Sequence, residues 1–115
     1  MVEAGVRALA AFNVAEFGAD RDLQDAEAKA HREYEAAKVR LEGEMEDRIS
    51  GLLARVRAEP QWRGYERGEK AAWARYDRLE ETLWRRLQAR YDELRLGREA
   101  VGRENQCRLD EAWMP

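Results

Sequence analysis

The chain has 115 residues, of which 44% are apolar and 39% are charged, and its net charge is −3. The length suits a single domain over residues 1–115, the apolar content excludes a disordered chain, and the small negative charge provides no general attraction to nucleic acid. Runs of alternating β-branched residues are absent, and Arg, Glu, Ala and Leu dominate the sequence. These features predict an all-α fold.

Cysteine usage and the N-terminal segment indicate the compartment. Cys107 is the only cysteine, so no disulfide can form within the chain, which favours a reducing environment. The first 18 residues lack the basic start of a secretory signal. No apolar run approaches the ~20 residues of a membrane span. We therefore expect a cytoplasmic protein with no membrane partner.

The first two predicted helices meet near residue 18. Apolar residues at helical spacing predict a short helix over residues 2–17, which Gly18 would end as a C-terminal cap. Asp20 and Asp22 are candidate N-caps of a second, longer helix over residues 20–57. The sequence thus predicts two helices separated by a short break.

The apolar residues of the second helix recur every eleven positions. Eleven residues in three turns correspond to about 3.67 residues per turn, close to the relaxed α-helix, so this period predicts nearly straight helices with hendecad-like packing. The series are Leu23, Tyr34, Met45 and Val56; Ala30, Leu41 and Leu52; and Ala26 and Ala37.

Pro60 interrupts the second helix, because the residue before a proline is driven out of the α region. Gly64 and Gly68 weaken the first turns that follow, which predicts a turn over residues 58–68. A third helix is then expected over residues 69–96. It can continue to residue 113 with a kink at one of the two glycines beyond residue 96.

Two long helices on either side of one break predict a long antiparallel helical hairpin. Residues 1–59 carry a net charge of −4 and residues 60–115 a net charge of +1, so we expect the acidic half to lie along the basic half. The expected ion pairs join Glu42, Glu44, Glu46 and Asp47 to Arg75 and Arg78, and Glu33 and Glu35 to Arg86.

A single hairpin leaves much of the predicted apolar surface uncovered. On a helical wheel the apolar face of the third helix spans about 140°, which is wider than one partner helix covers. Burial of the core-facing residues, at about 1.5–3 kcal/mol each, roughly balances a backbone ordering cost of about 1–2 kcal/mol for every residue. We therefore expect a second layer and favour a homodimeric helical bundle to which the N-terminal helix contributes.

Three of the four tryptophans stand eleven residues apart along one edge of this apolar face. At that edge the packing within one chain ends, so they would be the first side chains to meet another chain. Buried Trp, Tyr and Arg are the usual anchors of protein interfaces. The predicted function is therefore that of a non-enzymatic protein–protein interaction module, such as an adaptor, an assembly factor or a small inhibitor of another protein. The predicted interface comprises Trp62, Tyr65, Trp73, Tyr76, Trp84, Arg85, Arg86, Tyr91 and Trp113.

Groups that could carry chemistry are isolated in this sequence. His31 stands between Glu27 and Glu35 at four-residue spacing, which is typical of charge pairing on a solvated helix face. Cys107 has no histidine nearby in the sequence, and the acidic residues 42–47 lack the loop spacing of a calcium site. No glycine-rich phosphate loop is present. We predict no catalytic residue, no metal site and no cofactor.

A basic stretch over residues 85–98 supports an alternative function. Its arginines could bind phosphates while Trp84 and Tyr91 stack on bases, as in proteins that bind single-stranded nucleic acid. Acidic residues lie in the same window, which argues against nucleic acid as a partner. The arginines are Arg85, Arg86, Arg90, Arg95 and Arg98.

A second alternative comes from Trp62-Arg63-Gly64, which lies mid-chain at the predicted turn between two helices. This pattern resembles the WXG100 family of small helical hairpins that dimerise and are exported by type VII secretion. That family carries a Tyr-x-x-x-Asp/Glu export signal near the C-terminus. Here Tyr65 with Glu69, and Tyr76 with Glu80, match the spacing but lie in the middle of the chain. The resemblance implies an exported, dimeric hairpin.

Overall fold

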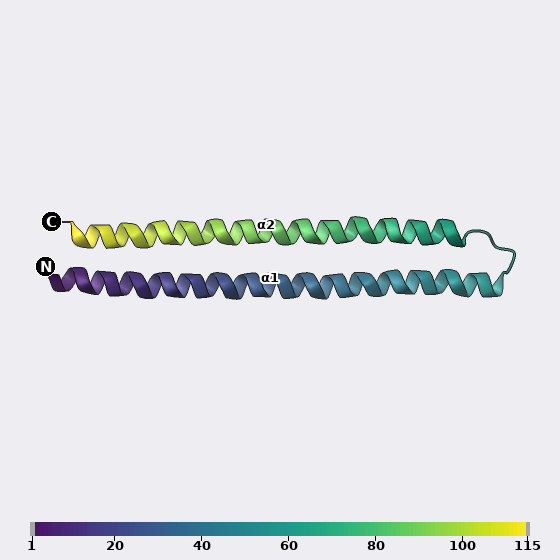
Figure 1. The fold of residues 1–115 in the computed structure, drawn as a ribbon, viewed down its shortest axis with the longest axis horizontal. Helices are drawn as coiled ribbons and strands as arrows, with labels where there is room; N and C mark the ends of the chain where they lie inside the picture. Colours follow the sequence, from purple (N-terminus) through teal and green to yellow (C-terminus); the bar gives the residue numbers. More distant parts are fainter. Residues whose placement is uncertain (1, 115) are drawn as a thin grey trace. The chain divides into compact units, whose positions relative to one another are not determined.

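The computed structural model describes residues 2–114 and contains two long helices. Helix α1 spans Val2–Ala58 and helix α2 spans Tyr65–Trp113, and no strand occurs in the described residues (Figure 1). The all-α prediction is confirmed. Tertiary contacts group the chain into two compact units. Residues 31–88 form the central unit, and the residues on either side of them form the terminal unit.

The central unit is an antiparallel helical hairpin, as predicted. Its two helical arms lie side by side and are joined by a short connection (Figure 1). The Tyr76 hydroxyl donates a hydrogen bond to Glu42 Oε1 at 3.3 Å, and Lys38 Nζ lies 3.6 Å from Glu80 Oε1. Residues whose numbers add up to about 118 therefore lie opposite each other in this unit.

Pro60 determines where the connection between the two helices lies, and the helix after it begins earlier than predicted. The backbone N–H of Trp62 donates to the carbonyl of Glu59 at 2.9 Å, which closes a β-turn with proline at its second position. Helix α2 then starts at Tyr65 rather than at residue 69, with the Gly64 carbonyl accepting from the Gly68 N–H. The predicted turn over residues 58–68 was thus too long.

Gly68 is tolerated in the first turns of α2 because it admits a close neighbour. A Cβ atom at this position would lie 2.7 Å from Cδ2 of Leu52 on α1. The leucine therefore packs directly on the α2 backbone, and this contact offsets the weak helix propensity of glycine.

The predicted break between a short helix 2–17 and a helix 20–57 is wrong, because α1 is continuous from Val2 to Ala58. Gly18 has no positive φ and lies inside the helix, so Asp20 is not a cap. A glycine within a helix costs about 1 kcal/mol relative to alanine, which is too little to end a helix whose packing continues on both sides. The glycines after residue 96 likewise lie inside α2, whose predicted continuation to residue 113 is confirmed.

The helices pack through positions that recur every eleven residues, so the hendecad-like prediction is confirmed. The period runs through both units and holds in α2 as well as in α1. The main buried or half-buried series are Phe12, Leu23, Tyr34, Met45 and Val56 in α1, and Tyr65, Tyr76, Leu87, Arg98 and Leu109 in α2.

The interior between the helices is thin. Only Leu41, Met45, Ala72 and Leu87 are buried apolar residues in the described chain, and no large side chain there is fully enclosed.

Two glycines in α1 offer a direct test of helix propensity. A Cβ added at Gly43 or Gly51 would meet no atom within 4 Å. Each Gly→Ala replacement is therefore expected to stabilise the hairpin by about 0.5–1 kcal/mol, raising the melting temperature by several degrees in circular dichroism. Gly68→Ala is the control, because its new methyl group collides with Leu52. Equal stabilisation by Gly68→Ala would contradict the close-contact explanation.

Candidate protein-interaction surface

Trp73 and Trp84 lie on one side of the central unit, and about half of each side chain is exposed. The Trp73 ring meets Tyr76 edge to face, with centroids 5.9 Å apart and an interplanar angle of 80°. The Trp84 ring meets Tyr34 of α1 in the same way, at 5.9 Å and 66°. Each indole is therefore held on one side by a tyrosine and open to solvent on the other. We call these four residues the aromatic edge.

Acidic residues surround the aromatic edge. The residues three or four positions from each tryptophan lie beside it on the helix surface, and the charged ones are Glu69, Lys70, Asp77, Glu80 and Glu81. On the α1 side, Glu42 accepts the hydrogen bond from Tyr76. Burial, followed by the nearby carboxylates of Glu80 and Glu42, raises the pKa of Tyr76, so its hydroxyl stays protonated and acts as a donor. The border of this surface is predominantly negative.

Trp62 does not belong to the aromatic edge, so the predicted line of three tryptophans holds only for Trp73 and Trp84. Trp62 lies in the connection before α2, where the helical spacing does not apply. The Arg55 guanidinium lies 4.4 Å from the centroid of its ring, a cation–π contact that joins the end of α1 to the connection. A Cβ at Gly64 would lie 2.4 Å from the same ring, so only glycine fits beneath it. Trp62 thus stabilises the connection.

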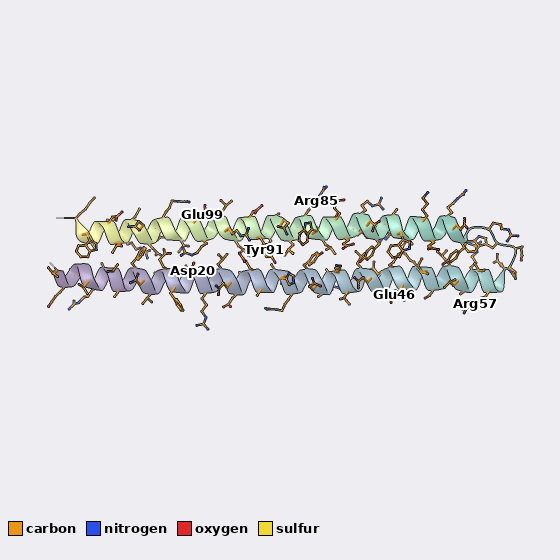
Figure 2. All side chains as sticks on the ribbon, viewed as in Figure 1. Asp20, Glu46, Arg57, Arg85, Tyr91 and Glu99 are labelled. Atoms are coloured by element: carbon orange, nitrogen blue, oxygen red, sulfur yellow. The ribbon has the colours of Figure 1, made fainter. Side chains whose placement is uncertain are left out.

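The remaining predicted interface residues are spread over both units. Arg85 points away from α1 and pairs with Glu81 at 2.6 Å, whereas Tyr91 is directed towards α1 (Figure 2). Trp113, in the terminal unit, rests on Gly5, where a Cβ would lie 2.6 Å from the indole. Of the predicted set, Trp73 and Tyr76 are in ring contact, and Trp84 lies on the same side of α2 in contact with Tyr34.

A polar cluster between the helices of the terminal unit was not predicted. Arg98 forms a salt bridge with Glu16 and donates to Asp20 Oδ1 at 2.8 Å, and Asn105 donates to Glu16 Oε1 at 3.1 Å. Asn105 is the one buried polar residue of the described chain. Sequence reasoning could have found this cluster, because Arg98 and Asn105 occupy interior positions of the eleven-residue pattern. Its antiparallel contacts set the pairing of the two helices there.

The polar cluster predicts a pH dependence of stability. Hydrogen bonds from Arg98 and then Asn105 lower the pKa of Glu16 below its ordinary value of 4.5. A carboxylate with a lowered pKa stabilises the folded state above the unfolded pKa and loses this effect as the pH falls through the folded pKa. We expect the melting temperature of the wild type to fall below pH 4.5 more steeply than that of Glu16→Gln. Parallel pH profiles would contradict a role of Glu16 in stability.

Pairs between the acidic and basic halves form within residues 2–114, but they are not the predicted ones. Across the two helices, the pairs in the described residues are Lys38–Glu80, Glu27–Arg95, and Arg98 with Glu16 and Asp20. Glu33, Glu44, Arg75 and Arg86 make no ion pair or hydrogen bond within residues 2–114. Around each helix, these residues lie outside the side on which the two helices touch. Opposite charges that lie at the same position along the hairpin therefore stay too far apart to pair.

The arginines of residues 85–98 are largely neutralised by acids of the same chain. Arg85 pairs with Glu81, Arg90 with Glu93, and Arg95 with Glu27. Arg98 is engaged in the polar cluster. This stretch therefore presents little net positive charge to a phosphate backbone.

Groups capable of chemistry remain dispersed in the described structure. His31 lies 3.7 Å from Glu35, and the thiol of Cys107 is exposed. Residues 2–114 hold no group of three His, Cys, Asp or Glu side chains placed to bind a metal ion. Neither α1 nor α2 has an apolar stretch long enough to cross a membrane.

Comparisons with protein-family models, with curated proteins and with solved structures give no match. The turn position of Trp62 and Gly64 agrees with the WXG100 resemblance, but no family model supports it.

Proposed function

We propose that the chain is a non-enzymatic protein–protein interaction module that binds another protein through the aromatic edge and works as a homodimer. The observation that carries this proposal is the half exposure of Trp73 and Trp84, two indoles on one side of α2 that are each held in place by a tyrosine. A partner can bury both rings at little entropic cost, since neither ring has to be ordered first.

The thin interior supports the same proposal. Within the described residues only four apolar side chains are buried, while large apolar residues are exposed in both units. Covering this surface with a second chain supplies the burial that one hairpin lacks.

The charge around the aromatic edge suggests the chemistry of the partner. Glu69, Asp77 and Glu42 border the indoles and carry no Lys or Arg ion pair within the described chain. A complementary partner surface would combine apolar side chains with a rim of Lys or Arg, as on a basic amphipathic helix. A cytoplasmic setting is part of the proposal, and the unpaired thiol of Cys107 is compatible with it.

Affinity capture with the immobilised chain tests the proposed function. We expect a host protein to be retained, to be released by excess free chain, and to dissociate faster as the salt concentration rises, because the edge is bordered by charge. Retention of nucleic acid instead, removed by nuclease treatment, would contradict the proposal. So would the absence of any protein that the free chain competes for.

A further inference from the structure

The interior of the terminal unit contains far less apolar material than the interior of the central unit. The two units have nearly the same number of residues, yet all four buried apolar residues of the described chain lie in the central unit. In the described part of the terminal unit, the large apolar side chains in the interior are only half-buried, and they are Phe12, Leu23, Tyr91, Leu94 and Leu109. The hydrophobic stabilisation of this unit is therefore weak.

Small residues leave a groove along the terminal unit. The groove has a volume of about 660 Å³, and much of its lining consists of Ala15, Gly18, Ala19, Ala26 and Gly97. A Cβ atom added at Gly18 or Gly97 would meet no atom within 4 Å. The α1 and α2 segments of this unit, which we call its two arms, therefore lack part of the dispersion contacts that close packing would give them.

The polar cluster occupies the interior positions that larger apolar residues could fill. Asn105 is buried, and only 16% of the Arg98 side chain is exposed. Both residues are on the α2 arm and bind Glu16 on the α1 arm, and Arg98 also binds Asp20 there. The loss of hydration of such groups offsets much of their attraction, so apolar side chains of similar volume often stabilise an interior as well or better.

The covalent connection also distinguishes the two units. The arms of the central unit are joined by the short connection between Ala58 and Tyr65. The arms of the terminal unit are joined only through the whole of residues 31–88. Separation of the terminal arms therefore requires no rearrangement of the connection, and the arms of the central unit stay tethered at close range throughout.

We propose that the terminal unit opens and closes separately from the central unit, and that the polar cluster is the latch that holds it closed. Openings of this kind, below the free energy of global unfolding, involve contiguous segments with few buried apolar contacts. In the open state the two arms separate and uncover Phe12, Leu23, Leu94 and Leu109. The device goes beyond the proposed function, because the aromatic edge belongs to the central unit.

Hydrogen exchange of the full-length chain, followed by mass spectrometry of its peptides, tests the separate opening. A separated arm loses its tertiary support, and an isolated helix of this length is marginal in water, so its amides exchange. We expect the amides of residues 10–28 and 91–107 to exchange at least about 10-fold faster than those of residues 38–52 and 70–86. Equal protection of the two units in the wild type would overturn the proposal.

Arg98→Ala tests the latch. The substitution removes the contacts with Glu16 and Asp20 together, so we expect exchange in the terminal unit to become about 10-fold faster, while exchange in residues 38–52 and 70–86 changes less than two-fold. Arg95→Ala is the matched control. Arg95 also pairs across the arms of this unit, with Glu27, but 61% of its side chain is exposed, so its loss should change exchange by less than about two-fold.

An apolar version of the cluster distinguishes a latch from ordinary packing. Glu16→Leu/Arg98→Met/Asn105→Leu keeps the interior filled but removes its polarity, so exchange in the terminal unit should become at least about 10-fold slower than in the wild type. Unchanged or faster exchange in this variant would contradict the latch. The proposal also fails if Arg98→Ala accelerates exchange equally in both units or unfolds the whole chain, because the two units would then open as one.

Discussion

Replacing Trp73 and Trp84 together with alanine is expected to abolish capture of the partner protein while the helical content stays unchanged. Each indole is about half exposed, so its contribution to folding is about half that of a fully buried ring. At an interface, a buried tryptophan commonly contributes 2 kcal/mol or more, which corresponds to about 30-fold in affinity for each ring. The measurement is titration of the captured partner, alongside a thermal melt.

Trp113→Ala is the control for this double variant. Trp113 is also about half exposed, but it belongs to the terminal unit, where it rests on Gly5, and is not part of the aromatic edge. Its removal should leave partner affinity within about two-fold. If the Trp73→Ala/Trp84→Ala variant instead unfolds at ordinary temperature, both rings act as core and the proposed interface is wrong.

Leu87→Ala is expected to cause the largest loss of stability among single substitutions. Leu87 is one of four buried apolar residues among residues 2–114, with 5% of its surface exposed. Truncating a buried leucine usually costs about 2–5 kcal/mol of stability. The interior of this hairpin is open at its sides, so neighbouring side chains can fill part of the cavity, and we expect a loss of about 2–3 kcal/mol. That cost is a large part of the 5–15 kcal/mol that stabilises a typical domain. Urea unfolding followed by circular dichroism measures it.

Leu53→Ala provides the matched control in the same unit. Leu53 is 41% exposed, so its truncation should cost less than about 1 kcal/mol. Equal losses for the two leucines would mean that Leu53 is covered as well, for instance by a second chain. Repeating both melts at several protein concentrations separates these explanations, because only a dimer melts at a concentration-dependent temperature.

The eleven-residue apolar period and Pro60 made the fold predictable. The eleven-residue spacing of apolar residues predicts which side of each helix is buried, and it requires only local sequence. The proline permits no continuous helix through residue 60, so the two helices have to meet at one turn. By contrast, the prediction that Gly18 ends a helix was wrong, because the effect of a glycine depends on its context. A glycine ends a helix only when the packing of the helix also ends there.

The candidate surface was predicted in part. Trp73, Tyr76 and Trp84 lie on one side of α2 because all three are inside this helix, where spacing along the sequence determines position around the helix. Trp62 shares their spacing but not their helix, so the same reasoning fails for it. The eleven-residue pattern places Arg98 and Asn105 in the interior, but it does not identify Glu16, more than 80 positions away, as their partner.

The sequence by itself determined the helices, the turn at Pro60 and the buried side of each helix, because these follow from backbone chemistry and from the spacing of apolar residues. Only the tertiary structure decided which charged side chains form ion pairs. Glu16 meets Arg98 between the two helices, whereas Glu44 and Arg75 lie opposite each other along the hairpin but form no ion pair within residues 2–114. Ion pairing requires side chains a few ångströms apart, and that distance depends on how two helix surfaces are turned towards each other.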